Sequence, residues 1–255
     1  MIVINGLTKY FGQKAAVEQL SLQVNPGEIF GFLGPNGAGK TTTVKMLTGM
    51  LKPTSGTAEV AGYDILEKPL EVKKRIGCVP ESGELFETLT AWEYLELVAD
   101  LHHLERQSAR SRMEEFLNLF GLFDEREQRL NTFSKGMKQK VLFTAALLHN
   151  PQVLFLDEPL TGLDANTALI IKELLKQFST QAKTIVFCSH VLEVVERICT
   201  RIAIINLGEL IVQGTPEEIL RQTGQPSLEQ AFSHLTGVRD VVEYTEDFLQ
   251  ALEQL

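Results

Sequence analysis

One glycine-rich stretch constrains the fold more than any other part of the chain. It reads Gly-Pro-Asn-Gly-Ala-Gly-Lys-Thr-Thr over residues 34–42 and fits the pattern G-x-x-x-x-G-K-[ST] without a mismatch. The apolar run 29–33 before it predicts a buried strand, and residues 41–47 after it predict a helix. A strand, a glycine-rich loop and a helix in this order are the context that this phosphate-binding motif requires.

The residue types of this loop suit a polyphosphate. Glycines let consecutive backbone N–H groups turn towards one centre, and the positive end of the next helix's dipole points to the same place. We expect the Lys40 amine to meet the β- and γ-phosphates of a nucleotide and the Thr41 hydroxyl to ligate Mg²⁺. The predicted phosphate-contacting residues are Gly34, Pro35, Asn36, Gly37, Ala38, Gly39, Lys40, Thr41 and Thr42.

Charge and hydrophobicity narrow the class of protein. The formal net charge of the 255 residues is −9, which argues against nucleic acid as the main partner because phosphate-backbone binding relies on clustered Lys and Arg. No run approaches the eighteen or so apolar residues of a membrane span, and the first residues lack a signal pattern. We therefore expect a cytosolic protein. Its Cys78, Cys188 and Cys199 are predicted to be free thiols in the core.

The first and last thirds of the chain predict α/β structure. Residues 2–4 and 20–24 predict strands joined through a turn over residues 8–12, which carries the adjacent rings of Tyr10 and Phe11. One of these rings either stacks on a purine or packs on the small sheet. Apolar runs at 153–156 and 184–188 alternate with helical patterns, which predicts a mostly parallel sheet with helices on both faces. The end of the chain, about 226–255, predicts an acidic helical extension.

The middle of the chain predicts only helices. Thr90 and Glu93 form a capping box, apolar residues recur with helical spacing between 113 and 120, and a third helix is expected over 135–149. Residues 82–150 therefore predict a helical lobe inserted into the core, which would comprise 1–81 and 151–225. Trp92 and the pair Leu85-Phe86 at the mouth of this lobe are either core residues or an exposed patch for a partner.

Polar side chains follow two of the predicted parallel strands. Asp157 and Glu158 come directly after the 153–156 strand, at the carboxyl end where open α/β sheets bind ligands. One carboxylate is expected to hold Mg²⁺, and the next to accept a proton from an attacking water. His190 follows the 184–188 strand in the same way and is expected to contact the γ-phosphate or to orient that water.

Taken in order, these motifs resemble the ATP-binding subunits of ABC transporters over roughly residues 2–235. Residues 34–41 are similar to the family's Walker A motif, 153–158 to its Walker B motif with a catalytic glutamate, and His190 to its switch histidine. The resemblance implies that Asp164 belongs to the D-loop at the nucleotide, and that Phe11 stacks on adenine, with Tyr10 as the fallback. It implies ATP and Mg²⁺ as cofactors.

Two segments depart from the family's usual pattern. Residues 133–137 stand where the signature LSGGQ is usual, and they retain Ser134 and Gly136, which the family uses on the γ-phosphate of the opposite subunit. Glu81 stands where the family usually has a metal-reaching glutamine. A carboxylate there can accept hydrogen bonds from metal-bound water, but it adds negative charge near the γ-phosphate.

The resemblance also implies how such a subunit works. Two copies, or one copy and a paralogous subunit, would sandwich two ATP molecules head to tail, and a transmembrane permease would dock on the 82–150 lobe. The signature variant, residues 80–81 and the tail 227–232 resemble the exporter-type branch, in which the subunit is peripheral on the cytoplasmic face of the membrane. A soluble ABC ATPase of repair or translation is the alternative. A small-molecule kinase would leave the Ser134 motif and the helical lobe unexplained.

Overall fold

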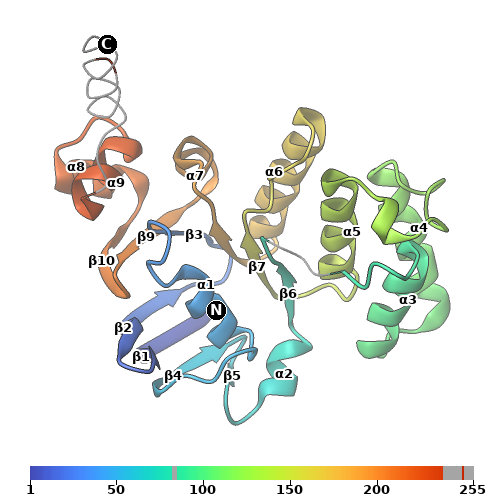
Figure 1. Ribbon diagram of the computed structural model, residues 1–255, viewed down its shortest axis with the longest axis horizontal. Coiled ribbons are helices and arrows are strands. Elements are labelled where there is room, and N and C mark those ends of the chain that lie inside the picture. The colour runs from blue at the N-terminus through green and yellow to red at the C-terminus, as the bar shows by residue number, and fades with distance from the viewer. Residues whose placement is uncertain (82–84, 238–248, 250–255) are drawn as a thin grey trace.

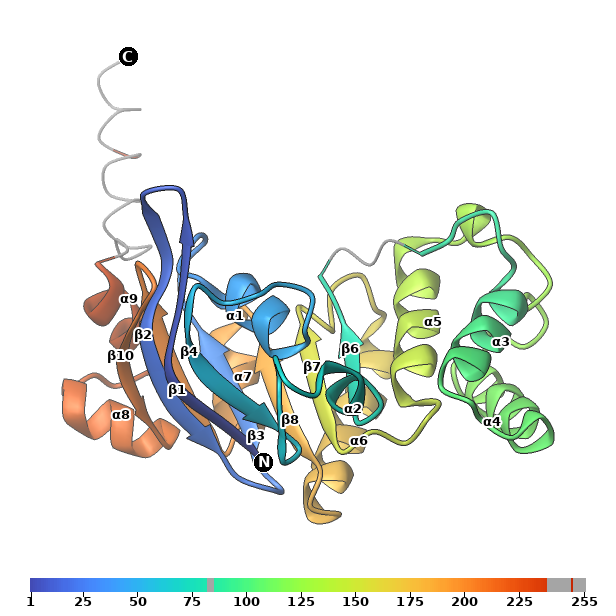
Figure 2. The same cartoon turned by 90° about the horizontal axis from the view of Figure 1, so that it is seen from below.

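A six-stranded sheet carries the candidate site. The computed structural model describes residues 1–81, 85–237 and 249, and its largest sheet has the strand order β10-β9-β3-β8-β7-β6 (Figures 1 and 2). β3, β6, β7, β8 and β9 run parallel, and β10 is antiparallel to β9. These strands are β3 (Ile29–Leu33), β6 (Ile76–Val79), β7 (Val153–Asp157), β8 (Thr184–Cys188), β9 (Arg201–Asn206) and β10 (Glu209–Gly214). The predicted parallel sheet is confirmed.

A second sheet is antiparallel, with the order β2-β1-β4-β5 (Figure 1). It consists of β1 (Ile2–Phe11), β2 (Lys14–Val24), β4 (Ser55–Val60) and β5 (Tyr63–Asp64). The turn predicted over residues 8–12 is wrong, because β1 continues to Phe11, which pairs with Lys14. The chain reverses instead at Gly12 and Gln13. The pairing of β1 with β2 has three register shifts between Ile4 and Tyr10, which break the alternation that would have marked a long strand.

Helices cover the sheets and form the predicted lobe. α3, α4 and α5 lie together at one end of the molecule, and Thr90 and Glu93 form the predicted capping box at the start of α3 (Figures 1 and 2). The helices are α1 (Lys40–Leu47), α2 (Pro69–Lys73), α3 (Ala91–Leu101), α4 (Arg106–Leu119), α5 (Lys135–Leu147), α6 (Ala165–Thr180), α7 (Leu192–Ile198), α8 (Pro216–Thr223) and α9 (Leu228–Thr236). The α/β fold class with a helical insertion is confirmed.

Alternating side chains of the six-stranded sheet build two cores. Phe30, Phe155 and Val186 pack with the antiparallel sheet and α1, whereas Leu33 and Phe187 pack with the helices of the other face. This second core continues without a break into the helical lobe through α5. Cys188 and Cys199 are buried in these cores, Cys78 is half-buried, and all three are free thiols, as predicted.

The apolar residues at the mouth of the lobe divide between the two alternatives. Leu85 is buried and Trp92 is half-buried against the core of the lobe, so both are core residues. Phe86 is 63% exposed and is not a core residue.

Within the described part of the chain, no helix is both long and apolar enough to cross a bilayer. Of the predicted C-terminal extension, α9 is described, and residues 238–248 and 250–255 lie outside the described residues.

Candidate functional site

The glycine-rich loop joins β3 to α1 in a conformation that only glycine tolerates at key points. Gly39, directly before α1, has φ +108°, and a Cβ there would collide with the carbonyl oxygen of Ala16. A Cβ at Gly34 would meet the carbonyl oxygen of Ile205 and, at 2.8 Å, the Cβ of Ala38. The loop is thereby pressed against β2 and β9 and opens on its other side. The N–H groups at the start of α1 suit an anion.

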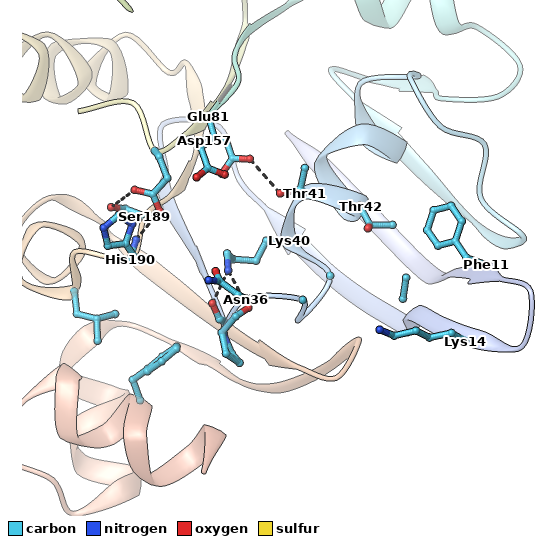
Figure 3. A pocket seen from close by; sticks show the side chains of 18 residues that line it. Phe11, Lys14, Asn36, Lys40, Thr41, Thr42, Glu81, Asp157, Ser189 and His190 are labelled. Atoms are coloured by element: carbon cyan, nitrogen blue, oxygen red, sulfur yellow. Dashed lines mark hydrogen bonds and ion pairs between the residues drawn. The ribbon is translucent and has the colours of Figure 1, made fainter. Parts of the chain in front are cut away.

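Lys40 and Thr41 extend from this loop into the site. The Nζ of Lys40 donates to the carbonyl oxygens of Gly34 at 2.5 Å and Pro35 at 3.1 Å. This folds the ammonium group back across the loop, where a bound phosphate would be (Figure 3). The Thr41 hydroxyl donates to Oδ2 of Asp157 at 3.3 Å and so links the loop to the end of β7. The structure therefore brings the predicted phosphate and metal ligands together.

Two buried carboxylates, Asp157 and Glu158, are adjacent in the sequence at the end of β7 but contact different partners. Asp157 is 8% exposed, and burial raises its pKa, with the nearby negative charge of Glu81 as the next cause; the Thr41 hydroxyl and Lys40 oppose this rise. Figure 3 shows Glu81 and Asp157 side by side. A cation bound between them would reduce the repulsion between these two carboxylates.

Glu158 is held by residues at the end of β8 instead. Its Oε1 accepts from the backbone N–H of His190 at 2.7 Å and lies 2.8 Å from Nδ1 of the same residue. Its Oε2 accepts from the hydroxyl of Ser189 at 3.2 Å. The His190 side chain is 76% exposed, whereas that of Glu158 is 10% exposed. Glu158 therefore lies in a pocket with a movable imidazole at its edge.

These groups line a single cavity of about 800 Å³, which suits a nucleotide in size. Phe11 lies at one end of it and is 54% exposed. The Tyr10 hydroxyl instead donates a hydrogen bond to Glu18, and Tyr10 does not line the cavity. The residues that line it are Phe11, Lys14, Ala16, Gly34, Pro35, Asn36, Gly37, Gly39, Lys40, Thr41, Thr42, Glu81, Asp157, Glu158, Ser189, His190, Leu192 and Phe232.

Four predicted site residues do not line this cavity: Ala38, which is buried within the loop, and Ser134, Gly136 and Asp164. Ser134 caps α5 by accepting from the N–H of Met137, and Asp164 caps α6 by accepting from the N–H and hydroxyl of Thr167. These hydrogen bonds lower the pKa of Asp164 to about 2. Gly136 lies against the carbonyl oxygen of Gly162, 2.5 Å from where a Cβ would be. The signature segment and the D-loop segment therefore contact each other, away from the nucleotide cavity of their own chain.

Several cavity residues were missed at the sequence level. Ser189 carried a signal, since it also follows β8 directly and stands beside His190. Lys14 and Ala16 of β2, Leu192 of α7 and Phe232 of α9 carried none, because only the packing of distant elements brings them to the loop.

The residues present fit Mg²⁺ and a nucleotide. Thr41, Asp157 and Glu81 supply the oxygen donors that Mg²⁺ prefers. Across residues 1–81 and 85–237, no cluster of three or more His, Cys, Asp and Glu side chains is arranged to hold a metal alone. A magnesium ion would therefore need the Thr41 hydroxyl and oxygens from outside the protein, as it commonly takes from substrate phosphates.

Comparison with known proteins identifies the family. A family model described as "ABC transporter" matches residues 17–161. The chain is 37% identical over 238 residues to the ABC transporter ATP-binding protein NatA of Bacillus subtilis, covering 91% of this chain and 96% of that protein. It is 35% identical over 249 residues to the daunorubicin resistance ATP-binding protein DrrA3 of Streptomyces coeruleorubidus, covering 93% of this chain and 79% of that protein.

Solved structures agree with these relatives. An ATP-binding subunit of an ABC transporter superposes with a TM-score of 0.87 at 30% identity, covering 92% of this chain and 99% of that one. A dimeric ATP-binding cassette in a post-hydrolysis state, bound to ADP and Pi, superposes with a TM-score of 0.77 at 26% identity, covering 84% and 98%. This chain therefore belongs to the ABC transporter family, as an ATP-binding subunit that hydrolyses ATP.

Proposed function

We propose that this subunit powers export through a separate transmembrane permease. The observation that carries the proposal is that Lys40, Thr41, Asp157 and Glu158 line one cavity, so phosphate-binding, metal-binding and proton-accepting groups converge. The names of relatives support the direction: one is a daunorubicin resistance protein, and a relative from Ralstonia nicotianae is a Nod factor export protein, 34% identical over 255 residues. Because these relatives are transporter subunits, they favour a transport role over one in repair or translation.

We assign the residues of the cavity as follows. The phosphates lie on the loop of residues 34–42, with Lys40 reaching the β- and γ-phosphates, and Phe11 stacks on the adenine. Thr41 and Asp157 would hold Mg²⁺, with Glu81 accepting hydrogen bonds from its water. The ion, when bound, neutralises charge on the phosphates.

Hydrolysis then needs one proton acceptor. A water oxygen attacks the γ-phosphorus, the bond from that phosphorus to the bridging oxygen breaks, and ADP leaves. Glu158 accepts the proton that this water loses, and its burial keeps bulk water from competing for the carboxylate. His190, whose side chain is largely exposed, swings from Glu158 to the γ-phosphate.

The site is completed by a second chain, either a second copy or a paralogous subunit. Ser134 stands at the N-terminus of α5 and Asp164 at that of α6, so both present capped helix ends to a partner across a head-to-tail interface. Two ATP molecules would lie between Ser134 and Gly136 of one chain and the phosphate loop of the other. ATP drives closure because it binds the closed state more tightly than the open one.

The permease is proposed to dock on the helical lobe, residues 82–150, at the cytoplasmic face of the membrane. The exposed Phe86 and the exposed side chains of Leu97 and Leu101 on α3 give this lobe an apolar surface that suits a protein partner. On this division of the chain, residues 1–81 and 151–225 bind ATP and residues 226–255 are an extension.

The Glu158→Gln variant tests the assignment of the base. It keeps the shape of the side chain but removes the carboxylate, so we expect unchanged ATP binding, nearly abolished turnover and accumulation of an ATP-bound dimer. Turnover is measured as phosphate release, and the dimer by light scattering with size exclusion. Full hydrolysis by this variant would refute the role of Glu158.

A pull-down tests the transport role. The Glu158→Gln variant, tagged and loaded with ATP, is recovered from detergent-solubilised membranes, with Lys40→Ala as the control that lacks the closed state. We expect a polytopic membrane protein that is absent from the control. Recovery of soluble proteins or ribosomes alone would contradict the export proposal while leaving the ATPase intact.

A further inference from the structure

Glu158 is attached to three consecutive residues of the neighbouring strand end. Its backbone N–H donates to the carbonyl oxygen of Cys188 at 2.9 Å, its Oε2 accepts from Ser189, and its Oε1 accepts from the N–H of His190. Its φ of +48° lies in the left-handed region, which a non-glycine residue occupies at a cost and only when its surroundings hold it there. This conformation turns the side chain towards β8.

The Ser189 side chain is held in place beside Glu158, whereas that of His190 is not. Its side chain is 7% exposed, and its Oγ accepts from the N–H of Val191 at 3.2 Å, which fixes the hydroxyl at the start of α7. The hydroxyl proton is then directed at Oε2 of Glu158. The imidazole of His190, by contrast, is exposed and can swing away from Oε1.

A count of hydrogen bonds shows that the carboxylate is held and still has room for water. A carboxylate offers about four lone-pair sites, two on each oxygen. Oε1 contacts both the N–H and the Nδ1 of His190, whereas Oε2 has the Ser189 hydroxyl as its one partner among the described residues. Oε2 therefore keeps an acceptor site for water in this arrangement.

We propose that Ser189 is a positioning residue that holds the Glu158 carboxylate in the orientation in which it receives the proton of the attacking water. The proposal rests on the role of Glu158 as base. Once the imidazole leaves Oε1, the Ser189 hydroxyl and the His190 N–H are the two groups that fix the plane of the carboxylate. Ser189 acts on the reaction through Glu158 and contacts no reacting atom itself.

The test compares variants at position 189 for turnover and for ATP binding. Ser189→Ala removes the hydroxyl, and we expect kcat to fall between about 10- and 100-fold, as for a misplaced catalytic group, with the Kd for ATP unchanged. Ser189→Thr restores a hydroxyl and should recover most of the rate. Ser189→Cys keeps the volume with a weak donor and should be intermediate; it carries the test if Ser189→Ala does not fold. Full activity of Ser189→Ala, or of Ser189→Cys in its place, would overturn the proposal.

Two controls separate positioning from general damage. Ser179→Ala removes a hydroxyl that bonds the carbonyl of Gly27 far from the cavity, and it should leave kcat unchanged. Ser189→Ala combined with Glu158→Gln should still accumulate the ATP-bound dimer, whereas loss of the dimer would assign Ser189 to the interface and refute the proposal. If Glu158→Gln alone hydrolyses ATP fully, the base assignment fails; if it is inactive and Ser189→Ala is fully active, only the role of Ser189 fails.

Discussion

Alanine substitutions at three glycines of the phosphate loop should differ in cost, because the structure constrains each glycine differently. Gly37 has φ +81° with open space where the methyl group of an alanine would lie, so Gly37→Ala adds backbone strain alone. Gly34 has no such φ, but a Cβ there would collide with Ile205 and Ala38, so Gly34→Ala adds overpacking alone. Gly39 combines φ +108° with a collision against the backbone of Ala16, so Gly39→Ala adds both.

Each of these costs has a typical size. A left-handed conformation costs an L-residue about 1–2 kcal/mol. Overpacking costs about 1–3 kcal/mol. We therefore expect losses in the free energy of unfolding of about 1–2 kcal/mol for Gly37→Ala, about 1–3 for Gly34→Ala and about 2–5 for Gly39→Ala.

Urea unfolding of the nucleotide-free protein measures these differences directly, since no bound ligand then contributes to stability. Calorimetry of ATP binding to each folded variant gives a second readout. Gly39→Ala should also weaken ATP binding, because the collision with Ala16 displaces the start of α1. If Gly37→Ala proves as destabilising as Gly39→Ala, or Gly39→Ala costs less than strain alone at its low end, about 1 kcal/mol, the geometry argued for this loop is wrong.

Two further predictions concern the helical lobe. Ser134→Ala should lower the rate of ATP hydrolysis while ATP binding to the monomer stays intact. Ser227→Ala, which removes the equivalent cap of α9, is the control and should leave hydrolysis unchanged. Equal loss of binding and hydrolysis in Ser134→Ala would mean that Ser134 acts on the ATP of its own subunit. The His149 ring stacks on that of His102 with centroids 3.7 Å apart, and burial lowers the pKa of His149 to about 4. Below about pH 6.5, His149 therefore binds a proton in the unfolded chain but stays neutral in the folded protein. The free energy of unfolding should fall as the pH drops from about 6.5 to about 4, by at most about 1.4 kcal/mol per pH unit. The loss should be smaller than this bound because water reaches the half-buried ring. In thermal unfolding measured across this pH range, His149→Gln should reduce the pH dependence.

The sequence predicted the elements whose signals are local. The phosphate loop, the capping box at Thr90 and the strands before Asp157 and Ser189 depend on residues next to one another, and the structure has them in place. α8 was missed although Thr215 and Glu218 form the same kind of capping box, which shows that the signal was present. β1 was cut short because its register shifts remove the alternating pattern on which strand prediction depends.

The contacts within the site could be predicted less well. That Ser189 donates to Glu158 follows from β7 and β8 being neighbours, and from the left-handed backbone of Glu158, neither of which the spacing of the residues encodes. Phe232 reaches the cavity only because α9 packs back on α7. A sequence pattern can name the residues at strand ends, but the pairing of those ends decides which of them touch.

The position of Ser134, Gly136 and Asp164 outside the cavity of their own chain has a mechanical consequence. The start of α5 contacts the loop after Glu158 in three places. The Gln139 side-chain amide donates to the carbonyl oxygen of Pro159 at 3.0 Å, and the Lys140 Nζ lies 3.5 Å from Oδ2 of Asp164. Gly136 packs against the backbone of Gly162. The Gln139 side chain is buried, so breaking its bond would leave an unsatisfied polar group. A force that moves the signature segment must therefore also move the loop that follows Glu158. In the head-to-tail dimer proposed here, the segment that would contact one ATP is thus attached to the loop that follows Glu158, the proposed base for the other ATP.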